Sequence, residues 1–151
     1  MKIYLAADHA GFELKEVIKD FLRKNQHDYS DLGTHSNESV NWAEYGAKAA
    51  QKVSEDPETS RAVLICGSGI GMSMIANKFK KVRAALCHTT YTAEMSRKHN
   101  NANILTLGAR ILDQDEALKI VQTWLETSFE GGRHKTRIDY LHNHIEKQNF
   151  K

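Results

Sequence analysis

Short apolar runs of strand length alternate along this chain with longer segments in which apolar residues recur at helical spacing. The strand-like runs span residues 2–7, 28–32, 61–66, 82–87 and 103–107. The segments with helical spacing span residues 13–24, 39–54, 68–79, 90–99 and 115–127. Because helices follow the strands, neighbouring strands are expected to pair in parallel through right-handed crossovers. The pattern predicts one α/β domain over residues 1–151, with a doubly wound, Rossmann-like sheet of five parallel strands between two helical layers.

The C-terminal segment follows a break at Gly131-Gly132 and is predicted to form a further helix over 135–147. Ile138, Leu141 and Ile145 form one narrow apolar stripe along it. A protruding terminal helix with a single stripe favours packing of about 133–148 on a partner subunit. The alternative is that this helix folds back on its own domain.

Composition limits the class of protein. Hydrophobic residues make up 40% and charged residues 26% of the chain, which fits a globular domain. The formal net charge of +2 is too near neutral for a surface dedicated to nucleic acid or membrane. The two cysteines lack the spacing of a disulfide framework, and no apolar run approaches the ~20 residues of a membrane span. We therefore expect a cytoplasmic protein with no nucleic-acid or membrane partner.

The most informative chemistry lies where the third strand-like run ends. Cys66 is followed by three alternating glycines, Gly67, Gly69 and Gly71, after which helical spacing resumes. Glycine lets the backbone approach a ligand closely, and a helix N-terminus favours bound anions and the thiolate form of cysteine. We expect Cys66 to be a base or nucleophile beside an anion-binding loop. Cys87 fits a buried core position instead.

The glycine loop does not match the common phosphate-binding fingerprints. Its third glycine comes one residue early for the dinucleotide fingerprint, and no Gly-Lys-Ser/Thr follows to make a P-loop. Met72 stands where a cysteine phosphatase would have its arginine, which disfavours that class.

Further polar groups are candidates for the same site. Asp8 and His9 follow the first strand, and Arg110 follows the fifth, so all three are expected at the edge where strands end. Asp8 also fits a plain helix N-cap. His99 and Asn100 end a predicted helix, where a histidine can simply complement the helix dipole.

The start of the terminal helix is basic. Arg133 and Arg137 lie one helical turn apart beside His134, an arrangement that suits a phosphate, although a solvated charged face is the alternative. Apart from His142 and His144, no histidine has metal-ligand spacing with another His or Cys. We expect no metal ion.

Together these segments resemble the B-type ribose-5-phosphate isomerases, a family that also contains the galactose-6-phosphate isomerase subunits. The matching segments are 7–12, 32–34, 66–71, 76–78, 96–100, 107–110 and 129–134. The resemblance implies an aldose–ketose isomerase of sugar phosphates without metal or organic cofactor. It also implies a homodimer or homotetramer whose active sites are shared between subunits.

The resemblance implies a role for each matching residue. Cys66 is the base that moves a proton between C1 and C2 through a cis-enediolate, and His99 opens the furanose ring. The loop from Gly67 to Gly71, with Ser68 assisting, binds the enediolate oxygen. Asp8 and Asn100 are implied to hold sugar hydroxyls, and the phosphate contacts are implied for His9, Arg110, Arg133 and Arg137, with His134 at the same wall.

One segment departs from the family pattern. Asn41-Trp42-Ala43 stands where many members have Asp-Tyr-Pro, which leaves the sugar preference and any contact by Trp42 open. The leading hypothesis is interconversion of ribose 5-phosphate and ribulose 5-phosphate. The alternatives are an isomerase of a six-carbon substrate such as allose or galactose 6-phosphate, and a non-catalytic phosphate-binding module, which would have no use for the thiol.

Overall fold

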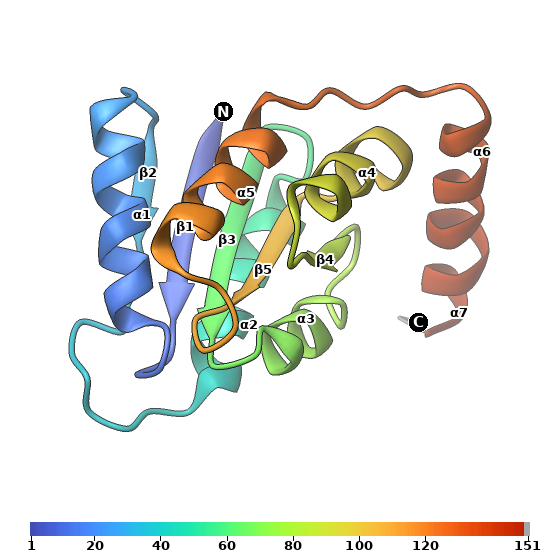
Figure 1. The fold of residues 1–151 in the computed structure, drawn as a ribbon. Helices are drawn as coiled ribbons and strands as arrows, with labels where there is room; N and C mark the ends of the chain where they lie inside the picture. The colour runs from blue at the N-terminus through green and yellow to red at the C-terminus, as the bar shows by residue number, and fades with distance from the viewer. Residues whose placement is uncertain (150–151) are drawn as a thin grey trace.

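The computed structural model describes residues 1–149 and contains one five-stranded parallel sheet in the order β2-β1-β3-β5-β4 (Figure 1). The strands are β1 (Lys2–Ala7), β2 (Tyr29–Asp31), β3 (Ser60–Cys66), β4 (Ala84–Leu86) and β5 (Ile104–Gly108). This confirms the predicted doubly wound architecture. The last two positions of the predicted domain, 150 and 151, lie outside the described residues.

Two helical layers cover the sheet and give it two separate apolar cores. The main helices are α1 (Phe12–Lys24), α2 (Trp42–Glu55), α3 (Ile70–Ala76), α4 (Thr90–Asn100) and α5 (Gln114–Glu126). Helices α1, α4 and α5 pack on one face, where Ile65 is fully buried, and α2 and α3 pack on the other, over Leu64. Alternate residues of a strand point to opposite faces, which is why neighbouring side chains of β3 enter different cores.

Two predicted helices are shorter than their apolar spacing suggested. Helix α2 begins at Trp42 rather than at residue 39, because the Asn41 side chain accepts the Ala43 N–H at 3.1 Å and caps it. Helix α3 begins after Gly69, whose φ of 77° is left-handed. It ends at Ala76, because the next residue, Asn77, caps it and its side-chain amide donates to the carbonyls of Ser73 and Ala84.

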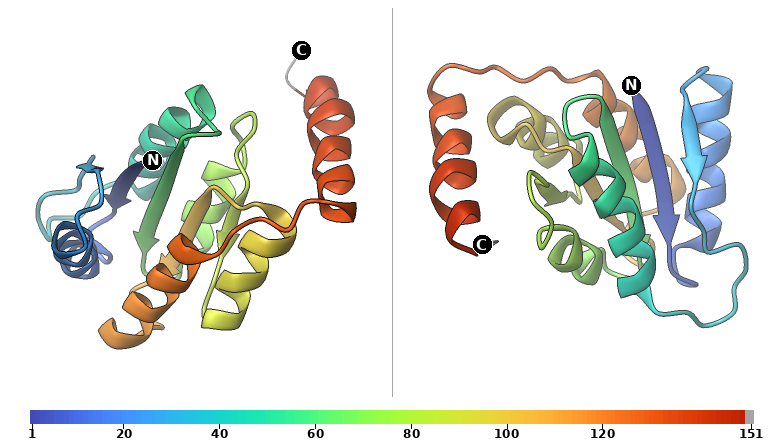
Figure 2. Two further views of the ribbon diagram at one scale, coloured as in Figure 1. Left: turned by 90° about the horizontal axis from the view of Figure 1, so that it is seen from above. Right: turned by 180° about the vertical axis from the view of Figure 1, so that it is seen from behind.

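The C-terminal helix stands beside β4, at the end of a long crossing segment (Figure 2). It comprises α6 (Arg133–Tyr140), a π-helical stretch η1 (Leu141–Glu146) and α7 (Lys147–Asn149). Its polar side contacts its own domain: Arg83 Nη1 lies 2.9 Å from His142 Nε2, and the Lys81 N–H donates to Glu146 Oε1 at 2.9 Å. The side chains of Tyr140, Leu141 and Ile145 are exposed.

No helix within residues 1–149 combines the length and the apolar character needed to cross a membrane.

A buried ion cluster ties α1 to the end of β2. The Lys15 side chain is fully buried, and its Nζ lies 2.6 Å from Asp31 Oδ2 and 2.8 Å from Glu16 Oε1. Asp31 also accepts the Gly33 N–H at 2.9 Å, so the cluster fixes the start of the loop that leads to α2. Burial opposes ionisation of Asp31, but the hydrogen bonds from Lys15 and Gly33 outweigh it and lower its pKa.

We expect Lys15→Met to lower the free energy of unfolding by about 3 kcal/mol, because it leaves a half-buried carboxylate without its main partner. The lowered pKa of Asp31 means that its stabilising contribution is present above about pH 4 and is lost as the pH falls further. Urea unfolding at pH 7 and pH 3 should therefore show a smaller acid loss in Lys15→Met than in the wild type. Lys24→Met, on the exposed end of α1, is the control. An equal acid loss in all three proteins would contradict the prediction.

Candidate active site

The carboxyl ends of β1, β3 and β5 meet at one edge of the sheet, where they border a cavity of about 530 Å³. The cavity is lined by Asp8, Trp42, Cys66, Gly67, Ser68, Ile70, Gly71, Arg110 and Ile111. Strand register explains the meeting, since Ala7 lies opposite Ile65 and Cys66 lies opposite Gly108. Most of the residues predicted after these strands are therefore brought together.

Cys66 is the last residue of β3 and is only 5% exposed. Its Sγ accepts the backbone N–H of Gly69 at 3.2 Å. An N–H aimed at the sulfur stabilises negative charge on it. The free thiol therefore lies at the cavity wall beside a backbone donor, as the glycine turn predicted. Cys87 is buried in the core, where burial raises the pKa of its thiol.

The turn that holds the sulfur requires glycine. A Cβ on Gly69 would lie 2.6 Å from Leu86 Cδ1 and 2.9 Å from the carbonyl carbon of Leu107. Gly67 lies under the Arg110 side chain, whose Nη1 would be 3.1 Å from an added Cβ. The Arg110 N–H also donates to the Gly67 carbonyl at 3.0 Å, which holds the arginine over the loop. Ser68 is fixed in the same turn, because its Oγ accepts the Ile70 N–H at 3.3 Å.

Asp8 and His9 follow β1 but have different environments. Asp8 is 5% exposed, and its Oδ1 accepts the Gly11 N–H at 3.1 Å, so it both closes the turn before α1 and lines the cavity. His9 does not line this cavity. Its Nδ1 accepts the Val40 N–H at 3.2 Å, which assigns the proton of the neutral ring to Nε2.

An apolar rim was not predicted. Trp42, Ile70 and Ile111 line the cavity while 40%, 51% and 51% exposed. The Trp42 indole lies flat against the loop, since a Cβ on Gly71 would be 3.0 Å from three of its ring carbons. The sequence places two of these residues beside the glycine turns, but only the tertiary structure shows that they surround one opening.

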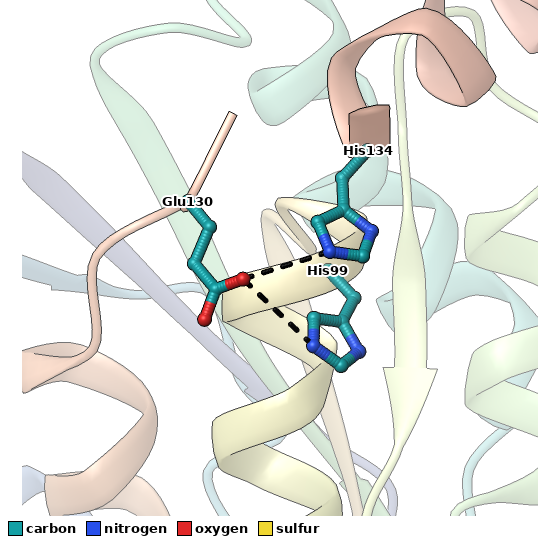
Figure 3. Close-up of side chains that lie close together, drawn as sticks. All are labelled: His99, Glu130 and His134. Carbon is teal, nitrogen blue, oxygen red and sulfur yellow. Dashed lines mark ion pairs between the residues drawn. The ribbon is translucent and has the colours of Figure 1, made fainter. Parts of the chain in front are cut away.

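The remaining predicted residues lie at the opposite edge of the sheet, where strands begin. His99 is near the end of α4, His134 is in the first turn of α6, and their rings stack with centroids 4.3 Å apart and planes 15° apart. Glu130, which the sequence analysis missed, has Oε2 at 4.0 Å from His99 Nε2 and 3.5 Å from His134 Nε2 (Figure 3). Asn100 lines a separate groove of about 320 Å³ that also borders α6.

Burial lowers the pKa of His134, and the positive charges of His99 and Arg133 lower it further, whereas Glu130 opposes the shift. His99, Glu130 and His134 offer three donor atoms within 4.8 Å of one another, of types that zinc binds. The nitrogen lone pairs of the two stacked rings lie in nearly parallel planes, so they do not point at one common ion. With Arg133 and Arg137 exposed on successive turns of α6, the arrangement suits an anion better than a cation.

Comparison with known proteins identifies the family. Residues 3–141 match the Ribose/Galactose Isomerase family. This chain belongs to that family. Ribose-5-phosphate isomerase B of Escherichia coli is 39% identical over 140 residues, which cover 93% of each chain. The structure of Clostridium thermocellum ribose-5-phosphate isomerase B superposes with a TM-score of 0.94 at 48% identity over 99% of each chain.

A second solved relative carries a sugar phosphate. The structure of Mycoplasma genitalium ribose-5-phosphate isomerase B with bound ribulose-5-phosphate has a TM-score of 0.93 and 37% identity. The match covers 99% of this chain and 97% of that one. The whole chain described above therefore has the architecture of this isomerase family.

The contact between Gly71 and Trp42 gives a direct test of the rim. We expect Gly71→Ala to displace the indole, because the new methyl would lie 3.0 Å from Trp42 Cδ2, Cε2 and Cε3. Acrylamide quenching of tryptophan fluorescence should rise, while the fully buried Trp124 gives a constant background. In a Trp42→Ala background the same change should leave quenching unaltered. Unchanged quenching in Gly71→Ala itself would show that the rim is not built this way.

Proposed function

We propose that this chain is an aldose–ketose isomerase that interconverts ribose 5-phosphate and ribulose 5-phosphate through a cis-enediolate. Family membership supports this function, as does the relative from Mycoplasma genitalium with bound ribulose-5-phosphate. The observation that carries it is the buried Cys66 sulfur, with the Gly69 N–H aimed at it, in a cavity bordered by Asp8 and Arg110.

In the proposed reaction, the Cys66 thiolate removes the proton from C2 of the open-chain aldose. The electron pair of that C–H bond forms the C1–C2 double bond of the enediolate, and the carbonyl oxygen on C1 takes up the negative charge. Backbone N–H groups of the loop from Gly67 to Gly71, together with Ser68, stabilise this charge with little reorganisation. The hydroxyl proton on the C2 oxygen then moves to the C1 oxygen. As the thiol returns its proton to C1, the negative charge left on the C2 oxygen forms the carbonyl of the ketose.

We further propose that each active site is completed by a second copy of the chain. Cys66 lies where strands end, whereas His99 and Arg137 lie where strands begin. β5 has 5 residues and separates the two edges by roughly 16 Å. A five-carbon sugar phosphate does not bridge them within one chain. The exposed apolar residues of the terminal helix support a homodimer in which the two edges of different subunits face each other.

The phosphate is assigned to the basic side of this combined site. Arg133 and Arg137 are exposed on successive turns of α6, and buried His134 lies between them in sequence. Arginines in this arrangement bind phosphate oxygens in a bidentate manner. Arg110 and His9 approach from the Cys66 side of the other subunit.

An isomerisation assay of the purified chain tests the proposed function. Ribose 5-phosphate should be converted to ribulose 5-phosphate, and the ratio of kcat/KM values for ribose 5-phosphate, allose 6-phosphate and galactose 6-phosphate defines the substrate. Binding of these sugars without turnover would identify a phosphate-binding module instead. A preference for a six-carbon substrate would keep the chemistry and replace the proposed substrate.

Cys66→Ala should abolish isomerisation while substrate binding, measured by calorimetry, stays within a few-fold of the wild type. The reason is that the variant removes the base but leaves the loop, Asp8 and Arg110 in place. Cys87→Ala is the matched control, since it removes the other free thiol from the core and should retain turnover. Substantial activity in Cys66→Ala would remove this thiol from the mechanism.

Mixing two impaired variants, assayed at a substrate concentration well below the raised KM, tests the shared site. Arg137→Ala should raise KM strongly, because a phosphate contact is lost. When Arg137→Ala and Cys66→Ala chains are allowed to exchange subunits, each hybrid dimer regains one intact site. Activity should then recover to about a quarter of the wild type. Mixtures that exchange, as mass spectrometry would show, but stay inactive would place both residues in one chain's site.

A further inference from the structure

Glu130 lies in the segment between α5 and α6, and a backbone contact fixes its position. Its N–H donates to the Lys98 carbonyl at 3.1 Å, at the end of α4, beside His99. A second contact holds the same segment, because Arg97 Nε donates to the Thr127 carbonyl at 3.3 Å. The carboxylate is therefore carried by a backbone that is bonded to the helix bearing His99.

The carboxylate faces both stacked imidazoles (Figure 3). Its Oε2 lies 4.0 Å from His99 Nε2 and 3.5 Å from His134 Nε2, which are ion-pair distances. The other charged groups that face this cluster are cationic: Lys98 on α4, and Arg133 and Arg137 on α6. Lys98 interacts with the Glu130 carboxylate, whereas Arg133 and Arg137 disfavour a proton on the His134 ring. Glu130 has the opposite effect and favours a proton on His134.

We propose that Glu130 is a positioning residue for ring opening by His99, an inference that rests on the proposed function. When the furanose opens, the bond between C1 and the ring oxygen breaks, the C1 hydroxyl loses its proton, and the ring oxygen gains one. An imidazole that accepts the first proton and donates the second is an imidazolium in between. A carboxylate beside it stabilises that state and fixes the ring, with Nε2 toward Glu130 and Nδ1 free for the sugar.

Glu130→Gln tests this role, because it keeps the shape of the side chain and removes its charge. The full chain is assayed in two ways. Turnover of ribose 5-phosphate requires ring opening. Exchange of the C1 protons of ribulose 5-phosphate with D2O requires only the proton transfer assigned to Cys66, because this ketose is open-chain.

We expect Glu130→Gln to slow turnover of ribose 5-phosphate about tenfold or more while C1 exchange stays within about twofold of the wild type. The acid limb of kcat/KM for ribose 5-phosphate should also move to lower pH, because an imidazolium without its carboxylate loses its proton more readily. Glu130→Asp should restore part of the rate. Glu94→Gln is the matched control, since Glu94 pairs with Lys98 on the exposed side of α4 and should change neither readout.

Three results would overturn the assignment: unchanged turnover of ribose 5-phosphate in Glu130→Gln, an equal loss in both readouts, or an unmoved acid limb. Failure of the proposed function has a different signature. In that case the wild type itself catalyses no C1 exchange, whereas a wrong assignment of Glu130 leaves wild-type exchange intact.

Discussion

Parallel pairing of β3 with both β1 and β5 is the constraint on which the site depends. The register places Ala7 opposite Ile65 and Cys66 opposite Gly108, so three loops leave the sheet at nearly the same height. Side chains alternate between the two faces of the sheet. A shift of β3 by one residue relative to its neighbours would therefore turn Cys66 to the opposite face, away from the apolar core that it shares with Met72. The long apolar strands, buried on both sides, make such a slip costly, and in this way the core holds the thiol in place.

Three loops that leave at one height must crowd, and the crowding accounts for glycines that the sequence leaves ambiguous. A Cβ on Gly11 would lie 2.6 Å from the Ile65 carbonyl oxygen, and one on Gly108 would lie 2.8 Å from the Ser68 backbone. These glycines permit the contact between loops, whereas Gly69 supplies the left-handed turn that aims its N–H at Cys66. Close approach of backbone to backbone is therefore as much a reason for the glycine pattern as close approach to a ligand.

The sequence predicted the strands and the residues at their ends, which depend on local residue spacing. It did not predict the features that depend on contacts between distant segments. Apolar runs such as 61–66 identify strands because both faces of the sheet are covered, and the end of β3 located Cys66 and Ser68 directly. Predicted helix boundaries were wrong where a side-chain cap, rather than apolar periodicity, sets the end of the helix, as at Asn41 before α2. The local sequence does not show that Ile111 borders the cavity or that the Glu130 carboxylate faces two imidazoles, because these positions depend on segments distant in sequence that meet in the fold.

The same topology separates the two halves of the proposed chemistry. A crossover helix starts near the end of one strand and finishes near the start of the next, so His99 at the end of α4 necessarily lies across the sheet from Cys66. No local rearrangement of a loop brings the two together without dismantling β5. An isomerase that uses a strand-end thiol and a helix-end imidazole on this fold therefore requires a second subunit. The long segment between α5 and α6 carries Glu130 to the end of the sheet where strands begin (Figure 1). In the proposed homodimer, this segment therefore brings the carboxylate and the arginines to the half-site that a second subunit completes.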